Sequence, residues 1–250
     1  MCRHLAFLGE PLAIRELLLD PPRSLERQSW NPLTQASGTV NADGFGVGWY
    51  APDDPVPARY RRAGPVWGDL GFADLARVTR TGALLAAVRG ATLPGADGEA
   101  AAAPFTADRW LFSHNGVVPG WPGGLDPVAA TLSATELLAL EARTDSALIW
   151  ALVLHRLRAG EAPGPALAGV VREVAEAVPG ARLNLLLTDG VTMAATAWGD
   201  SLSYLTGPGR TVVASEPYDD DPRWTAVPDR TVLTVSRADV VLSPLEEPSP

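Results

Sequence analysis

Short apolar runs that have the length of a β-strand recur along this 250-residue chain. The run ALLAAVR (83–89) is apolar without alternation, which is typical of a strand that is covered on both faces. Turn residues such as Gly, Pro and Asp-Gly separate the runs. Strands are therefore predicted at 4–9, 45–51, 58–63, 83–89, 109–116, 181–189, 192–199, 201–206, 210–215 and 230–236.

Helical patterns lie mainly between the two groups of strands. Apolar spacing and end signals predict helices at 11–20, 69–79, 135–160 and 164–178. Leu148, Leu152 and His155 share one apolar stripe, which predicts that His155 is a buried core residue. Strands, then helices, then a closing meander predict an α+β fold in which helices cover two antiparallel sheets.

One domain is expected over residues 1–244, because 46% of the residues are apolar and can bury a substantial core. The segment 245–250 is rich in Pro and Glu, which predicts a disordered tail. No apolar run reaches the length of a membrane span, and no secretory signal precedes the first strand. Together with a single cysteine, these features lead us to expect a cytoplasmic protein.

The net charge of −9 argues against nucleic-acid binding, which needs clustered basic residues. All 20 basic residues are arginine, so a lysine general base, a Schiff-base lysine and a P-loop lysine are excluded. Zinc-type spacings and dinucleotide fingerprints are absent from the sequence. We therefore expect no metal and no organic cofactor.

Cys2 is the only cysteine, and it stands directly after Met1. Removal of Met1 would place its thiol beside a free α-amine, whose pKa of about 7.7–8.0 leaves part of it neutral near pH 7. One residue would then supply both the nucleophile and the base. The alternative is a small half-buried residue or an unreactive terminal thiol. On a strand, His4 shares a face with Cys2, and Arg3 points away from it.

The segment SHNG (113–116) follows an apolar strand. Acyl transfer needs hydrogen-bond donors that are aimed at a developing oxyanion, and the Asn115 side-chain amide and the Gly116 backbone N–H are two adjacent donors. His114 would support this segment. The alternative is a plain turn, because Asn-Gly is a strong turn dipeptide.

Two charged residues complete a candidate site for a zwitterion. Arg89 in AVRGAT (87–92) ends a buried strand, where it binds either a ligand carboxylate or an internal acid, and Thr92 adds a hydroxyl. Asp145 is suited to a substrate ammonium, or it is the ordinary first-turn acid of a helix that Thr144 caps.

Taken together, the initial MC and the segments NADGFGVGWY (41–50), VRGAT (88–92), SHNG and TDSALIW (144–150) resemble the class II glutamine amidotransferases in order and spacing. These are N-terminal-nucleophile hydrolases with a four-layer αββα sandwich. The resemblance implies hydrolysis of a small γ-glutamyl substrate through a glutamyl thioester. It also implies these roles: Cys2 as the nucleophile, Asn115 and Gly116 as the oxyanion hole, Arg89 with Thr92 on the α-carboxylate, and Asp145 on the α-ammonium.

Two features depart from glutamine-using relatives. Leu93 follows VRGAT where many of them have TRWATHG, which leaves room for a different leaving group. No synthetase domain follows, which favours a free-standing amidohydrolase or a subunit of a complex. Over residues 1–244, longer matches such as MCRHLAFLGEP, AWGDSLS and ASEPYDDDPRW resemble the amidohydrolases of actinobacterial ergothioneine biosynthesis.

That second resemblance implies a substrate whose leaving half carries a trimethylated histidine. Aromatic faces and carboxylates hold such a quaternary ammonium. We therefore expect Tyr218, Asp219 or their neighbours to approach it, with Trp30 or Trp67; the alternative is core packing for the tryptophans and a solvated turn for the Asp run. Two other functions stay open: a glutaminase subunit that supplies ammonia to a partner synthase, and a non-catalytic domain that binds glutamyl ligands.

Overall fold

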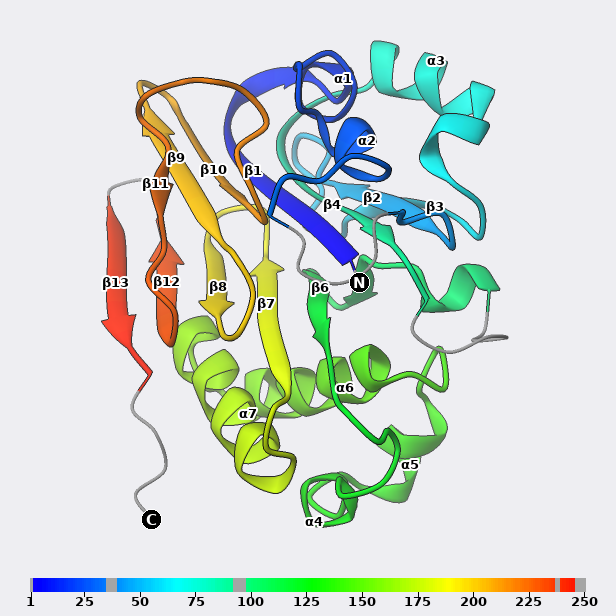
Figure 1. Cartoon of the computed structure of the whole chain (residues 1–250), viewed down its shortest axis with the longest axis vertical. Helices are drawn as coiled ribbons and strands as arrows, with labels where there is room; N and C mark the ends of the chain where they lie inside the picture. Colours follow the sequence, from blue (N-terminus) through cyan, green and yellow to red (C-terminus); the bar gives the residue numbers. More distant parts are fainter. Residues whose placement is uncertain (1, 35–39, 92–97, 237–238, 246–250) are drawn as a thin grey trace.

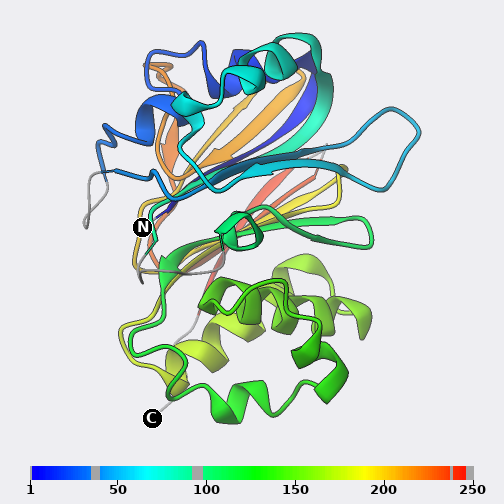
Figure 2. The same cartoon turned by 90° about the vertical axis from the view of Figure 1, so that its right-hand side faces the viewer.

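The computed structural model describes residues 2–34, 40–91, 98–236 and 239–245. Two antiparallel β-sheets lie face to face, and helices cover both outer faces, so that four layers follow one another (Figure 2). The predicted α+β class and its αββα sandwich are therefore confirmed.

Strands from both ends of the chain mix in the two sheets (Figure 1). The first sheet has the order β11-β9-β10-β1-β4-β2-β3 and the second the order β13-β12-β8-β7-β6-β5. The first contains β1 (Cys2–Ala13), β2 (Phe45–Trp49), β3 (Ala58–Arg62), β4 (Arg80–Arg89), β9 (Ser203–Gly207), β10 (Arg210–Ala214) and β11 (Thr225–Ala226). The second contains β5 (Phe105–Ala107), β6 (Trp110–Val117), β7 (Arg182–Thr188), β8 (Met193–Ala197), β12 (Thr231–Val235) and β13 (Val240–Pro244).

The helices form two separate outer layers (Figures 1 and 2). The first sheet is covered by α1 (Arg15–Leu18), α2 (Leu25–Gln28) and α3 (Leu70–Val78). The second sheet is covered by α4 (Asp126–Ala129), α5 (Ala134–Leu138), α6 (Asp145–Arg158) and α7 (Pro163–Ala177). None of the helices in the described ranges combines the length and the apolar character that a membrane crossing requires.

The meander expected over 181–236 is wrong. The chain leaves the second sheet after β8, adds β9 and β10 to the first sheet, and returns to the second with β12. Tight turns predict that successive strands reverse direction, but they do not say which sheet each strand joins. The sheet is decided by the pairing of β10 with β1, which lies more than 200 residues earlier; one of the pairs is Leu5 with Ala214.

Two predicted helices differ in extent from those observed. The helix expected at 11–20 shrinks to α1, because β1 continues past Pro11 and pairs Leu12 with Thr81 of β4. The helical material expected at 135–160 is broken into α5 and α6. Thr144 begins the second of these, since its side chain accepts a hydrogen bond from the Ala147 N–H at 3.3 Å.

His155 is not a core residue. Its side chain is 44% exposed, and its Nδ1 lies 2.8 Å from Glu136 Oε1. The apolar face of α6 packs on the sheet through residues such as Leu148 and Leu152, whereas His155 lies beside α5, which contains Glu136.

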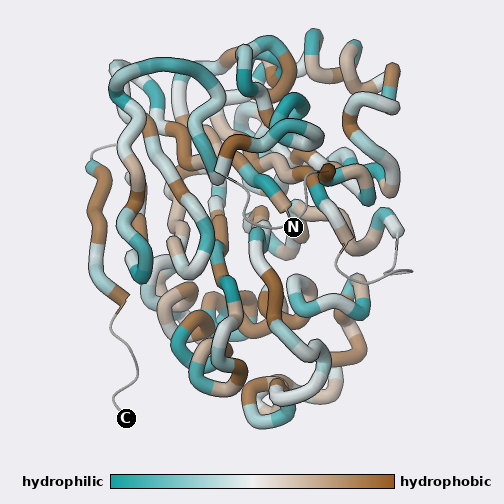
Figure 3. The backbone as a smooth tube through the Cα atoms, viewed as in Figure 1, coloured by the Kyte–Doolittle hydropathy of each residue, from teal (hydrophilic) through white to brown (hydrophobic). Residues whose placement is uncertain are grey.

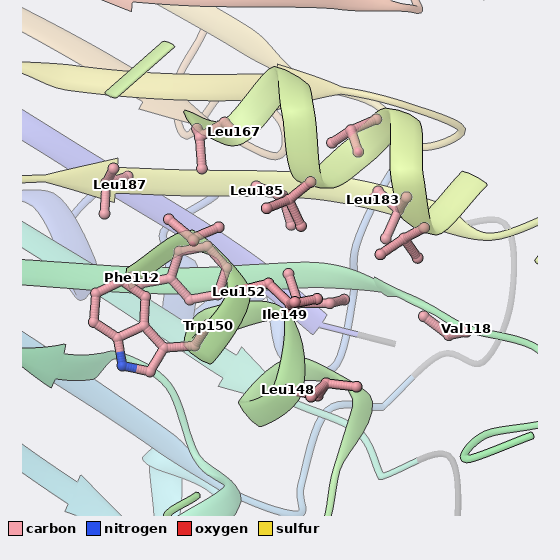
Figure 4. Packing of buried hydrophobic residues seen from close by; sticks show 14 of the residues in the cluster. Phe112, Val118, Leu148, Ile149, Trp150, Leu152, Leu167, Leu183, Leu185 and Leu187 are labelled. Atoms are coloured by element: carbon pink, nitrogen blue, oxygen red, sulfur yellow. The ribbon is translucent and has the colours of Figure 1, made fainter. Parts of the chain in front are cut away.

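The largest core lies between the second sheet and α6–α7 (Figure 4). Phe112 of β6 stacks on Trp150 of α6 with ring centroids 5.1 Å apart. The alternate residues Leu183, Leu185 and Leu187 of β7 point toward the same helices (Figure 4). Figure 3 shows hydrophobic residues along the central strands and along these helices, whereas the segment that follows β10 is mainly hydrophilic.

A second core fills the space between the sheets. Ala6, Leu85, Leu111 and Leu186 belong to it, and each comes from a different strand. At the C-terminal end, Leu245 is buried and its N–H donates to the Arg230 carbonyl at 2.7 Å. The rest of the expected tail, 246–250, lies outside the described residues.

Candidate active site

Cys2 and Arg89 face each other across β1 and β4. Directly opposite residues on antiparallel strands point to the same side of the sheet. Here that side is the space between the two sheets, because Ala6 and Leu85, which have the same alternation, pack there. Both residues line a cavity of about 250 Å³.

This cavity opens where β1 begins and where β4 and β6 end. Its polar wall contains Cys2, Arg89, Gly116 and Asp145. Its apolar wall contains Ala101, Ala103, Phe105, Val118 and Trp121. The structure therefore brings four of the predicted site residues together, although they are far apart in the sequence.

Arg89 ends β4 with its main chain fixed. Its N–H donates to the Gly44 carbonyl and its own carbonyl accepts from the Asp43 N–H, both at 2.8 Å. Its guanidinium donates to the Asp43 carbonyl at 3.2 Å. Within the described part of the chain, no carboxylate forms a salt bridge with Arg89, which favours a ligand over an internal acid as its partner. Thr92 and Leu93 lie outside the described residues.

Asp145 is the first residue of α6, and two backbone donors orient its carboxylate. Its Oδ2 accepts from the Val118 N–H at 3.0 Å and its Oδ1 from the Ser146 N–H at 2.8 Å. The capped first turn expected from the sequence is thus present, and the same carboxylate lines the cavity. An acid at this position can hold a cation inside the cavity.

The backbone at Gly116 of β6 lies tightly against the backbone of its neighbour β7. A Cβ atom at this position would lie 1.9 Å from the Arg182 carbonyl oxygen and 2.5 Å from His114 Nε2. Only glycine fits such a contact. His114 in turn donates from Nε2 to the Arg182 carbonyl at 2.9 Å and pairs through Nδ1 with Ser146 Oγ at 3.0 Å, so it braces this segment as expected.

Asn115 alternates with Gly116 and is fully buried between the sheets. It does not line the cavity itself. Its Nδ2 lies 3.3 Å from Ser215 Oγ, and its Oδ1 has no hydrogen-bond partner.

Burial raises the pKa of the Cys2 thiol, and the negative charge of Asp145 adds to this. The N-terminal charge and Arg89 act in the opposite direction and lower the pKa. A thiol that burial keeps protonated needs a base close by before it can attack.

His4 is fully buried and pairs through Nδ1 with Ser113 Oγ at 3.2 Å. Burial, together with electrostatic effects of His114 and Arg3, lowers the pKa of His4 to about 3. His4 is therefore neutral near pH 7, and it does not line the cavity.

Arg3 lies on the opposite face of β1 and is fully buried. Its Nε is 4.0 Å from the Glu216 carboxylate. Glu216 also accepts hydrogen bonds from the N–H groups of Leu33 and Thr34. The pair thus ties the segment after α2 to the first sheet.

The residues expected to hold a quaternary ammonium are not at the cavity. Tyr218 is buried in the core with its ring edge-on to Trp224. The Asp219 carboxylate accepts from Trp224 Nε1 at 2.7 Å. Tyr218 therefore packs in the core. An approach of Asp219, Trp30 or Trp67 to the leaving group stays a prediction; Trp30 and Trp67 pack on each other with ring centroids 5.2 Å apart.

Sequence reasoning missed several residues at the cavity, two of which contact each other. Trp121 and Arg143 both line it, and Trp121 Nε1 donates to the Arg143 carbonyl at 3.3 Å. The only sequence signal was a tryptophan inside the turn-rich segment PGWPGG (119–124), and a turn does not indicate which part of the fold its side chain contacts. Over the described ranges, no group of three or more His, Cys, Asp or Glu side chains could hold a metal ion.

The sandwich, with a cysteine at the start of its central strand, is the architecture of the N-terminal-nucleophile hydrolases. Residues 24–208 match the family of class-II glutamine amidotransferases, and the chain belongs to this family.

Curated relatives extend the match over the whole length. The chain is 43% identical to gamma-glutamyl-hercynylcysteine sulfoxide hydrolase of Mycolicibacterium smegmatis, covering 98% of this chain and 100% of the relative. It is 42% identical to the protein of the same name in Mycobacterium tuberculosis, covering 98% and 97%. It is 26% identical to a probable glutamine amidotransferase of Saccharomyces cerevisiae, covering 98% and 84%.

Solved structures share the fold. A glutamine aminotransferase class-II domain protein from Silicibacter pomeroyi superposes with a TM-score of 0.69 at 23% identity, covering 98% of this chain and all of that one. Glutamine phosphoribosylpyrophosphate amidotransferase from B. subtilis gives 0.65 at 13% identity, and this chain covers 49% of it.

Proposed function

We propose that this chain hydrolyses the γ-glutamyl amide bond of γ-glutamyl-hercynylcysteine sulfoxide, a step of ergothioneine biosynthesis, to give glutamate and hercynylcysteine sulfoxide. The observation that carries the proposal is the cavity shared by Cys2, Arg89, Gly116 and Asp145. The identity of 43% over the full length of a hydrolase of that substrate supports the choice of leaving group.

The glutamyl half is a zwitterion, and the cavity offers one charge for each of its ends. Arg89 binds the α-carboxylate, for which a guanidinium is suited because it donates two parallel hydrogen bonds. Thr92 adds a hydroxyl to the same carboxylate. Asp145 binds the α-ammonium. With both ends held, the γ-carbonyl lies against the Cys2 thiol.

The reaction begins after removal of Met1. The α-amine of Cys2 takes the thiol proton, and the thiolate forms a bond to the γ-carbonyl carbon. The amide of Asn115 and the N–H of Gly116 donate to the oxyanion. As the oxyanion collapses, the carbon–nitrogen bond breaks, and the ammonium of Cys2 gives its proton to the leaving amine.

A glutamyl thioester on Cys2 remains. Water attacks its carbonyl carbon while the α-amine accepts a proton from that water. The carbon–sulfur bond then breaks, glutamate leaves, and the thiol regains its proton. Each proton that the amine accepts it also returns, so the cycle consumes only water.

Intact mass spectrometry and glutamate release test this proposal together. We expect the purified protein to lack Met1, to gain one adduct from a diazo-ketone glutamine analogue, and to lose that adduct in Cys2→Ala. We also expect kcat/KM to be at least tenfold higher for the sulfoxide than for glutamine. A mass that retains Met1 with no adduct would defeat the mechanism. Equal or faster use of glutamine would favour a glutaminase, and activity in Cys2→Ala would favour a role without this nucleophile.

A further inference from the structure

Ser215 follows β10 directly and continues its pairing with β1. Its N–H donates to the His4 carbonyl at 2.9 Å, and its Oγ accepts from the His4 N–H at 3.0 Å. The residue is fully buried. Two main-chain contacts thus fix the Ser215 hydroxyl against the strand that begins with Cys2.

The same hydroxyl is the contact of the Asn115 side chain. Asn115 Nδ2 lies 3.3 Å from Ser215 Oγ, while Asn115 Oδ1 is buried without a partner. A primary amide carries two N–H donors. When one of them points to Ser215, the carboxamide is held in place and the second N–H stays available for an oxyanion.

The hydroxyl can anchor either orientation of the amide. Ser215 Oγ uses one lone pair for the His4 N–H, which leaves it one lone pair and one proton. Turned by 180°, the carboxamide would accept that proton at Oδ1 and direct both N–H groups away from Ser215. In both arrangements the position of the amide depends on the same oxygen atom.

We propose that Ser215 is a positioning residue that sets the Asn115 amide for oxyanion stabilisation. This inference rests on the proposed function, because the amide matters to the rate only if a tetrahedral oxyanion forms. Ser215 does not touch the substrate; it acts through Asn115.

A second serine offers a matched control. Ser201 Oγ donates to the Ser215 carbonyl at 2.8 Å, and among the described residues the hydrogen bond of the Asn115 amide goes to Ser215 Oγ instead. Ser201→Ala therefore removes a hydrogen bond to the same residue while it leaves the hydroxyl and its contact with Asn115 in place.

The test compares two reactions of the same thiol in the full-length processed protein. Hydrolysis of γ-glutamyl-p-nitroanilide passes through an oxyanion, whereas alkylation of Cys2 by iodoacetamide displaces iodide and forms none. For Ser215→Ala we expect kcat to fall about 10- to 30-fold, less than the full loss of an oxyanion donor, with KM within about twofold. Alkylation of Ser215→Ala and both reactions of Ser201→Ala should stay within about twofold of wild type.

A double-mutant cycle separates positioning from general damage. In an Asn115→Ala background, Ser215→Ala should lower kcat by less than about twofold, because its effect passes through the missing amide. If Ser215→Ala does not fold, Ser215→Cys replaces it in the test. A cysteine fills the space that alanine would leave, but its sulfur is only a weak acceptor, so we expect the same loss of kcat.

Wild-type kcat in Ser215→Ala, an equal fall in alkylation, or an additive effect in the Asn115→Ala background would overturn the inference. A wild-type protein that cleaves the anilide but not the sulfoxide would overturn only the proposed substrate. A wild-type protein that cleaves no γ-glutamyl amide would overturn both.

Discussion

Cys2 and Arg89 are cross-strand partners at the ends of β1 and β4, so the thiol and the guanidinium share one face of the first sheet. Regular pairing from His4–Ala87 to Leu8–Ala83 fixes this register. A shift of one strand by one residue would put the two side chains on opposite faces of the sheet, one of them toward the helices that cover it. The strand pairing thus places a positive charge beside the thiol.

That arrangement predicts opposite pH responses for two charge-neutralising variants. Arg89 lowers the pKa of Cys2 and Asp145 raises it. Arg89→Gln should therefore move the midpoint of the pH-dependent alkylation of Cys2 upward, and Asp145→Asn should move it downward. Arg158→Gln is the control, because Arg158 is paired with Asp108 at the surface and does not line the cavity. Shifts in the same direction for Arg89→Gln and Asp145→Asn would contradict the electrostatic account.

Local sequence pattern was sufficient to predict the strand that ends at Arg89 and the helix cap at Thr144. It was also sufficient to single out the motifs around Cys2 and Gly116. These depend on periodicity and on residue chemistry within a few positions. The sheet that β9 and β10 join was not predictable, because pairing across the whole chain decides it.

The candidate site shows the same division. The donor chemistry of the segment SHNG indicated Asn115, but nothing in the sequence indicated that Ser215, 100 residues away, lies against its amide. Tyr218 was wrongly predicted to approach the ligand, because the sequence pattern of an aromatic residue beside acids does not distinguish a ligand contact from packing in a core. His155 is exposed because it lies beside α5 rather than over the sheet, which the helical period does not show.

Gly116→Ala should damage both folding and activity. Its Cβ would overlap the Arg182 carbonyl oxygen at 1.9 Å, so β6 or β7 must move. We expect a loss of about 1–3 kcal/mol or more in the free energy of unfolding, measured by urea denaturation, as for other overpacked sites. Gly64→Ala is the matched control, because a Cβ there meets nothing within 4 Å. Equal stabilities of the two variants would refute the steric argument.

The core between the second sheet and α6–α7 gives a prediction for stability alone. Leu185 is fully buried in it, so Leu185→Ala should lower the free energy of unfolding by about 2–5 kcal/mol. Leu138→Ala, at a side chain that is 88% exposed, should change it by less than about 0.5 kcal/mol. Chemical denaturation of both variants measures the difference, and a small effect at Leu185 would mean that the helices are not packed on β7 as described.

His4 gives a prediction for stability as a function of pH. Burial, His114 and Arg3 lower its pKa to about 3 in the folded protein. An unfolded chain has a histidine pKa of about 6.5. Between these values the unfolded state binds a proton that the folded state does not, so the free energy of unfolding must fall as the pH falls. For one such group the limiting slope is about 1.4 kcal/mol per pH unit, and above pH 6.5 the contribution to the slope vanishes.

His4→Gln removes this titration while it keeps a polar side chain opposite Ser113. Urea denaturation from pH 7 to pH 4 should therefore show a shallower loss of stability for His4→Gln than for the wild type. His155→Gln, which removes a partly exposed imidazole on α6, should keep the steep wild-type dependence. The two substitutions make the same chemical change and differ in the burial of the imidazole that they remove. If stability depends on pH in the same way in His4→Gln and in the wild type, the prediction is contradicted, because the buried imidazole would then gain its proton in the folded state.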